Sequence, residues 1–446
     1  MTLSALAQAE IPTPLIRLPH AQRVSLALAL RGGPRYEPPG DAGLTHAVEH
    51  LIFRGAGPYP DATRLLAACE ALGEEPAAHT ADDALVVQWD VDPDAVGPAV
   101  TLLLELLLRP RYAGFAAEVE VIREELLERL DDRGRLTASD DLLRELVFGE
   151  HPLGRSILGS EARLRSLHVE EVEAWRARLV RGGNLVLAAA GPLTPEAWSA
   201  ACAGLSAIPS GPALPEPAAP PDLGGAVRFV EVKGSSQVEL AVCLRGPGTD
   251  DPRHPALRVL FDLLDGGPSA PLREALVDSG LSYDAQASLT SFPECALLEL
   301  ELAVEQRKLG AAIEALREAL RSASARVDAA DLARVQRVAA RRARWLQDDP
   351  TALAEDLALR ALRGQPLDPE HALARRAAVT PEEVADLGQG LLQPSRRTAL
   401  VLGTPCPSQR PSARRALEPP WYPLASPPRP GPQGPRAPPH PRALEP

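Results

Sequence analysis

The sequence lacks the features that would place the protein in a membrane, in a secretory pathway or on nucleic acid. No apolar run among its 446 residues approaches the roughly 18 to 20 that a membrane helix needs. The opening MTLSALAQAEIPTPLIRLPH has no basic start followed by a long apolar stretch, as a secretory signal would. Positive charge is also scarce, with 47 basic residues against 60 acidic ones and a net charge of −13. Because nucleic acids and anionic membranes attract basic surfaces, we expect neither as a partner, and we expect a cytoplasmic protein.

Cysteine is sparse and unpatterned. The five cysteines are scattered along the chain with no paired spacing. The sequence therefore predicts neither a disulfide framework nor a zinc ribbon.

Proline, in contrast, is abundant and unevenly spread. Residues 208–222 (IPSGPALPEPAAPPD) hold six prolines without apolar periodicity, which is typical of a stiff interdomain linker. Residues 404–446 hold 15 prolines in 43 residues and almost no apolar pattern, so we expect a disordered tail. A length of about three usual domains agrees with more than one folded unit.

The two halves around the linker repeat each other. VSLALALRG at 24–32 recurs as VELAVCLRG at 238–246, a constant offset of 214, and both read as buried strands. Each half then has a helix-like stretch and, later, a long charged helical pattern. We therefore expect an α+β protein of two homologous domains, an N-terminal one at 1–207 and a C-terminal one at 223–403.

The repeat sets polar residues of one copy against core residues of the other. His46, Glu49 and His50 of the first copy fall on three leucines of the second. These are Leu260, Leu263 and Leu264. Since a shared fold needs only the apolar version, a function other than folding must explain the polar one.

The segment His46-Ala47-Val48-Glu49-His50 has the composition of a metal site. Two histidines at i and i+4 share one helical face and can hold one zinc ion, as in the inverted metallopeptidase motif H-x-x-E-H. Glu49 points to the same side and can take a proton from water. The alternative is a pair of surface histidines, which the apolar flanks of this helix disfavour because unpaired buried polar groups are costly.

A third zinc ligand is expected from a second helix. The stretch EVEVIREELLE offers Glu118 and Glu125 on one face and Glu124 about 100° away. A helix this rich in carboxylates is also commonly just a solvated surface.

Together these residues resemble the pitrilysin, insulysin and mitochondrial processing peptidase family of zinc peptidases. The motifs are GGPRYEPPGDAGLTHAVEHLIFRG, the helix EVEVIREELLE and the loop GEHPLGRSILGSEARLRSL in the first half, and SSQVEL, LLDGG and GLSYDAQAS in the second. The resemblance spans residues 14–403. It implies two α/β sandwich domains, each a mixed sheet flanked by helices, that form half of a clam-shell chamber.

The resemblance also assigns the site. His46, His50 and Glu125 would bind zinc, Glu49 would be the general base, and Glu118 would orient the site from behind the ligands. Two family positions differ here. An edge-strand asparagine is replaced by Ala77, with His79 two residues further on, which puts the binding of the substrate backbone in doubt.

The second departure concerns a substrate clamp in the C-terminal half. Where the family has an arginine this chain has Pro271, while the clamp's Tyr283 is kept. We therefore expect a zinc endopeptidase or oligopeptidase that acts on a peptide substrate and works as a heterodimer with a zinc-less homologous subunit carrying the clamp. A homodimer using Arg273 is the alternative. A non-catalytic scaffold subunit and a proline-rich adaptor are the other functions considered.

Overall fold

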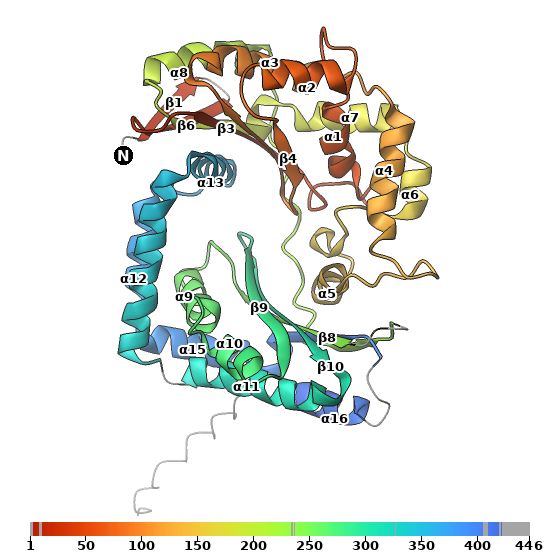
Figure 1. Ribbon diagram of the computed structural model, residues 1–446, viewed down its shortest axis with the longest axis vertical. Coiled ribbons are helices and arrows are strands. Elements are labelled where there is room, and N and C mark those ends of the chain that lie inside the picture. Colours follow the sequence, from red (N-terminus) through yellow and green to blue (C-terminus); the bar gives the residue numbers. More distant parts are fainter. Residues whose placement is uncertain are drawn as a thin grey trace, which may run out of the picture.

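Two mixed β-sheets flanked by helices make up the protein, as expected (Figure 1). The computed structural model describes residues 3–8, 11–232, 235, 237–325, 327–404, 409–418 and 421. The first sheet has the strand order β1-β2-β6-β3-β5-β4, and the second has the order β7-β11-β8-β10-β9. The strands are β1 (Leu3–Gln8), β2 (Ile11–Arg17), β3 (Val24–Arg31), β4 (Ala77–Thr80), β5 (Ala84–Val91), β6 (Leu185–Gly191), β7 (Val227–Val230), β8 (Gln237–Pro247), β9 (Ser282–Ser291), β10 (Cys295–Glu305) and β11 (Arg397–Leu402).

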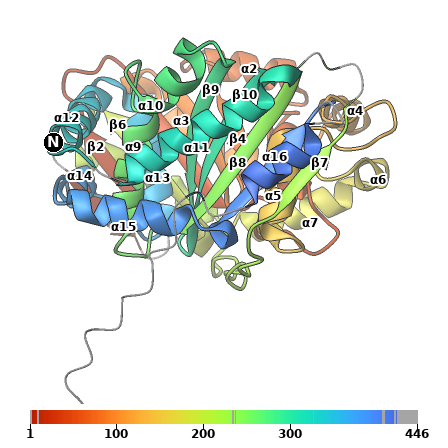
Figure 2. The same cartoon turned by 90° about the horizontal axis from the view of Figure 1, so that it is seen from below.

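The helices fall into two sets in chain order. The first set is α1 (Leu44–Ile52), α2 (Ala62–Glu70), α3 (Val96–Leu108), α4 (Phe115–Leu127), α5 (Ser139–Phe148), α6 (Glu161–Arg165), α7 (Val169–Leu179) and α8 (Pro195–Ala201). The second is α9 (His254–Asp265), α10 (Pro271–Arg273), α11 (Leu309–Ala325), α12 (Ala329–Trp345), α13 (Pro350–Leu362), α14 (Pro369–Ala377), α15 (Pro381–Leu391) and α16 (Arg410–Leu417). Figure 2 shows α11, α15 and α16 laid across one face of the second sheet.

The duplication read from the sequence is visible in the topology. Each sheet contains one parallel pair, β2 with β6 and β7 with β11, followed by antiparallel neighbours in the same order. The long helices α4 and α12 begin at Phe115 and Ala329, again 214 residues apart. The first sheet differs from the second by the additional strand β1.

The two halves exchange one helix each. Helix α13 of the second half packs through Leu353, Leu357 and Leu362 on the first sheet, against β2, β3, β5 and β6. Helix α5 of the first half packs through Leu143 and Phe148 on the second sheet, against β8 and β11. Thus all strands of the first sheet lie within 1–207 and those of the second within 223–403, but each range also covers a face of the other's sheet.

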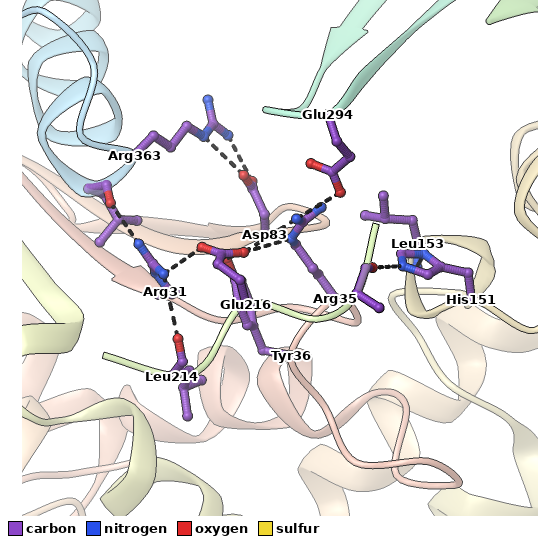
Figure 3. A network of polar contacts seen from close by, with 12 residues as sticks. Arg31, Arg35, Tyr36, Asp83, His151, Leu153, Leu214, Glu216, Glu294 and Arg363 are labelled. Atoms are coloured by element: carbon purple, nitrogen blue, oxygen red, sulfur yellow. Dashed lines mark hydrogen bonds and ion pairs between the residues drawn. The ribbon is translucent and has the colours of Figure 1, made fainter. Parts of the chain in front are cut away.

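The proline-rich segment 208–222 forms neither strand nor helix, and ion pairs hold it in place (Figure 3). Glu216 forms ion pairs with Arg31 at 2.5 Å and Arg35 at 3.3 Å, and the Tyr36 hydroxyl donates to it at 3.0 Å. Arg35 is only 4% exposed and also pairs with Glu294 of the second half at 2.9 Å. A linker fixed in this way does not act as a free tether.

The expectation of a tail disordered throughout 404–446 is wrong for part of that range. Residues 410–417 form α16, and Ala413, Leu417 and Trp421 are buried in the core of the second domain. The Trp421 indole donates to Ala416 O at 2.9 Å, and the Arg397 guanidinium lies 4.2 Å from its ring centre. These three apolar side chains are spaced four residues apart and so lie on one helical face. The high proline content of the segment hid this pattern in the sequence.

Two further expectations concern membranes and cysteine. No helix among the described residues is long and apolar enough to cross a bilayer. Cys69, Cys202, Cys243 and Cys295 are buried free thiols, and Cys406 lies outside the described residues.

Candidate metal centre and active site

Helix α1 presents the H-x-x-E-H segment, and its start is fixed by Glu37. The Glu37 carboxylate accepts hydrogen bonds from the backbone N–H of Gly43 at 2.9 Å and of Thr45 at 2.6 Å, which satisfies two of the free donors at the helix end. Gly43 has φ 98°, and a Cβ there would lie 2.9 Å from Leu158 O. The apolar face of α1 is buried in the core, so the helix cannot rotate to move its histidines.

Three side chains from two helices meet at one point. His46 Nε2 and His50 Nε2 each lie 3.6 Å from a different carboxylate oxygen of Glu125 on α4. The two imidazole centres are 4.6 Å apart, with the rings inclined at 70°. Among the described residues these three form the one group of histidine, cysteine or acidic side chains close enough to hold a metal ion.

The spacing of these donors fits zinc. Ligands about 2.0 to 2.1 Å from a tetrahedral ion lie about 3.3 Å from each other, close to the 3.6 Å seen here. The same distances are too long for good hydrogen bonds. Two imidazoles and a carboxylate also match the donor set of catalytic zinc sites, which leave a fourth position for water.

The protonation of the site agrees with this fit. Burial, and then the charge of His50, lower the pKa of His46 to about 4, which keeps its ring neutral and able to donate a lone pair. Its Nδ1 is buried and has no hydrogen-bond partner among the described residues. Burial raises the pKa of Glu125, and the neighbouring His50 opposes that shift.

The Glu118 carboxylate contacts the side of the His50 ring that faces away from Glu125, as the family resemblance led us to expect. Its Oε1 lies 2.9 Å from His50 Nδ1, and its Oε2 pairs with Arg54 at 3.2 Å. A carboxylate on the far ring nitrogen of a histidine fixes the ring's tautomer and aims the other nitrogen at the metal. Glu124, by contrast, is exposed, and among the described residues its side chain pairs only with Arg123.

Glu49 and the edge strand β4 lie beside the three donors. The Thr80 hydroxyl donates to Glu49 Oε2 at 2.5 Å, so the strand fixes the carboxylate from outside the helix. Ala77 is exposed on the same strand, which ends the first sheet. His79 pairs with Glu355 of α13 at 3.2 Å, and this hydrogen bond raises the pKa of His79.

A cavity of about 260 Å³ opens next to Glu49 and His50. Apolar side chains make up part of its wall, namely Phe53, Ala62, Leu66, Pro76 and Ala78, while Arg54, Glu75 and Glu118 are its other polar residues. Space for an apolar side chain therefore lies directly beside the candidate catalytic group.

The clamp positions of the second half are placed on its surface. Tyr283 is 90% exposed on β9, the edge strand of the second sheet. Pro271 begins α10, and the nearby Arg273 pairs weakly with Asp278 at 3.7 Å. Tyr283 is therefore open to a ligand, while Arg273 already pairs with a residue five positions further along the chain.

Two residues that hold the site were missed in the sequence. Thr80 is the last residue of the stretch GEEPAAHT. Its contact with Glu49 becomes visible only in the structure, where β4 lies against α1. Arg54 follows His50 by four residues, a spacing that could have suggested a shared partner.

The comparisons with known proteins agree with this geometry. The family model described as "Insulinase (Peptidase family M16)" matches residues 14–161, and "Peptidase M16 inactive domain" matches residues 166–338, so that together they cover most of the chain. The chain belongs to the M16 peptidase family. The predicted resemblance is thereby confirmed, and both model matches lie in the duplicated region.

Relatives of this M16 chain carry zinc-protease names. It is 29% identical over 297 residues to an "uncharacterized zinc protease" of Mycobacterium bovis, a match covering 64% of this chain and 66% of the relative. A protein of the same description from Streptomyces coelicolor is 29% identical over 299 residues, 63% of this chain and 62% of the relative. The match thus spans somewhat less than two thirds of each relative's length.

Solved structures show the same fold. A peptidase M16 inactive domain from Pseudomonas fluorescens has a TM-score of 0.81 at 19% identity, covering 90% of this chain and 98% of that one. A protease from Helicobacter pylori has a TM-score of 0.82 at 15% identity, covering 90% and 99%. At such identities the likeness establishes the two-domain M16 fold.

Proposed function

We propose that the chain is a zinc-dependent metallopeptidase that hydrolyses peptides or unfolded protein segments. The observation that carries the proposal is the convergence of His46, His50 and Glu125 at tetrahedral ligand spacing beside Glu49. Zinc-protease names among the relatives support it.

The chain's own residues divide the work. Zinc, when bound, would polarise the scissile carbonyl and acidify its water. Glu49 accepts a proton from the attacking water and passes it to the leaving amine, and Thr80 holds its carboxylate in place for this. Glu118 keeps the His50 ring oriented.

The substrate would lie extended along the open edge of β4, beside the candidate metal centre. The two domains would form half of a clam-shell chamber, so that enclosure rather than a tight pocket selects substrate size. The other half would be a zinc-less homologous subunit supplying the clamp arginine that Pro271 replaces. Because the chamber needs a second subunit, activity is expected from the pair.

A non-catalytic scaffold subunit is the second candidate, and two residues favour it. The Ala77 side chain has no polar atom to hold a substrate carbonyl, and Pro271 can donate no hydrogen bond. These losses affect substrate binding, whereas all four residues of the metal and proton chemistry are retained.

Metal analysis combined with a Glu49 variant tests the function. Wild-type protein should contain about one zinc per chain and, with a zinc-less homologue, cleave a mixed peptide library. Glu49→Gln should keep the zinc and lose turnover, because the amide retains the shape but cannot accept a proton. The exposed Glu70→Gln is the matched control. Zinc-loaded protein that is inert under all conditions would favour the scaffold, and protein without zinc affinity would end the proposal.

A further inference from the structure

One face of α9 is polar where its counterpart in the first domain is core. His254, Arg258 and Asp262 are spaced four residues apart and so share a face. The offset of 214 places Arg258 on Leu44 and Asp262 on Val48, both of which are buried in the first core. Folding alone therefore does not require this face to be charged.

Helices α12 and α14 add positive charge against this face. Figure 2 shows the three helices on the same side of the second domain, and α9 contacts both of the others. Arg376 of α14 forms an ion pair with Asp262, and Arg342 of α12 donates to Gly266 O at 2.9 Å. Arg375 of α14 approaches Pro252 O at 3.5 Å. We call Arg258, Arg342 and Arg376 the arginine junction, because the charges of Arg342 and Arg376 act on Arg258; Arg375 lies near the other end of α9.

The positive charge of the arginine junction exceeds the negative charge of the acidic residues beside it. Asp262 already forms an ion pair with Arg376, and Asp251 forms one with the neighbouring Arg253. The Nε2 atom of His254 is hydrogen-bonded to the Ser291 hydroxyl at 2.9 Å. The junction is thus a concentration of positive charge in a chain whose net charge is −13.

Arg258 is the arginine of the junction for which no hydrogen bond or ion pair is found among the described residues. Its Nε is buried with no hydrogen-bond partner, and its guanidinium makes no hydrogen bond or ion pair with any described residue. The guanidinium does make a cation–π contact with the Phe261 ring, whose centre lies 5.1 Å away. Burial and the positive charges of Arg376 and Arg342 lower its pKa, against the opposing effect of Asp262.

A partly buried guanidinium without a partner is costly, and an arginine fork matches carboxylate and phosphate oxygens. We propose that the arginine junction is a binding site for an oxyanion, with Arg258 as its principal ligand-binding residue. The ligand is a phosphate or a carboxylate, from free phosphate or from the C-terminal end of a peptide. This site is separate from the candidate metal centre and does not depend on the proposed peptidase activity.

Calorimetric titration of the full-length chain at constant ionic strength tests the site. Inorganic phosphate, and an acetylated tripeptide with a free carboxylate, are titrated in parallel with the amidated tripeptide. Binding of phosphate alone would identify free phosphate as the ligand, whereas binding of the peptide acid but not of its amide would identify a peptide carboxylate. Arg258→Gln should weaken the binding at least tenfold, while Arg337→Gln, at an exposed arginine of α12, should not.

Thermal unfolding separates binding from structural support. In chloride, Arg258→Gln should unfold at the same or a higher temperature than wild type, because the variant removes an unpaired charge. In phosphate the wild type should gain several degrees more than the variant, since general salt effects raise both equally. The proposal is overturned if neither anion binds, if both proteins gain equally in phosphate, or if the variant is destabilised alike in both salts.

Discussion

The Glu118 carboxylate lies 2.9 Å from His50 Nδ1 and also pairs with Arg54. This contact determines which nitrogen of His50 is free, because a ring that donates from Nδ1 presents a lone pair on Nε2. Nε2 is the atom that faces Glu125. The orientation of one proposed ligand is therefore set by a residue that does not itself face the metal position.

Replacing Glu118 should weaken zinc binding without abolishing it. Glu118→Ala should lower zinc affinity about 10- to 100-fold, the usual effect of losing a partner behind a ligating histidine. Competition with a chromogenic chelator measures this. Glu120→Ala, an exposed carboxylate of the same helix, is the control. Unchanged affinity in Glu118→Ala would mean that the contact does not orient the ligand.

The third ligand can be separated from its sequence neighbour. Glu125→Gln should sharply lower zinc affinity, because a neutral amide is a poor replacement for a carboxylate ligand. Glu124→Gln should leave it nearly intact, since that side chain is 66% exposed and pairs with Arg123, away from the histidines. Zinc per chain after dialysis is the measurement. The opposite order of effects would shift the assignment by one residue.

Helical spacing predicted the parts of the site that lie close in sequence, and the family resemblance supplied Glu118 and Glu125 from the second helix, but the other long-range contacts could not be predicted. Helical spacing was enough to place His46 and His50 on one face, and the repeat offset anticipated the matching sheets. Thr80 was missed because its role depends on β4 reaching α1. The exchange of α5 and α13 was missed for a similar reason, since an amphipathic pattern does not state which sheet it covers.

The buried Glu299 of β10 should make stability depend on pH. Burial raises its pKa from 4.5 to about 7, and Arg144 opposes the shift. Between those values the folded protein holds a proton that the unfolded chain has lost, so stability falls as pH rises from 4.5 to 7 and stays lower above 7. The neighbouring carboxylates that add to the shift are Glu301, Asp82 and Asp140.

Glu299→Gln should remove this loss. The variant should show a flatter stability profile below pH 7 and be more stable at pH 8, by an amount on the order of 3 kcal/mol. Urea unfolding at pH 5, 6, 7 and 8 measures this, with the exposed Glu196→Gln as control. A variant less stable than wild type at pH 8 would mean that the ionised form is well compensated.

The end of the chain should matter for stability up to Trp421 and little beyond. Ending the chain after Thr404 removes Leu417 and Trp421 from the second core, where they are 1% and 2% exposed. The loss should be roughly 3 kcal/mol or more. Ending it after Pro423 should be nearly neutral, because the remaining sequence is mostly proline and polar. Denaturant unfolding of the two truncations compares them directly, and equal stabilities would show that α16 contributes nothing.

Peptide cleavage should require a second subunit. An extended peptide beside zinc must be held in register, and a guanidinium that binds its carbonyls does this well. This chain has Pro271 where the clamp arginine is expected, and Arg273 already pairs with Asp278. The purified chain alone should therefore bind zinc but cleave a mixed peptide library poorly, and a zinc-less homologue carrying arginine and tyrosine should restore cleavage. Arg273→Gln should not change the activity of the pair. Robust turnover by the chain alone, lost in Arg273→Gln, would instead establish a homodimer that uses Arg273.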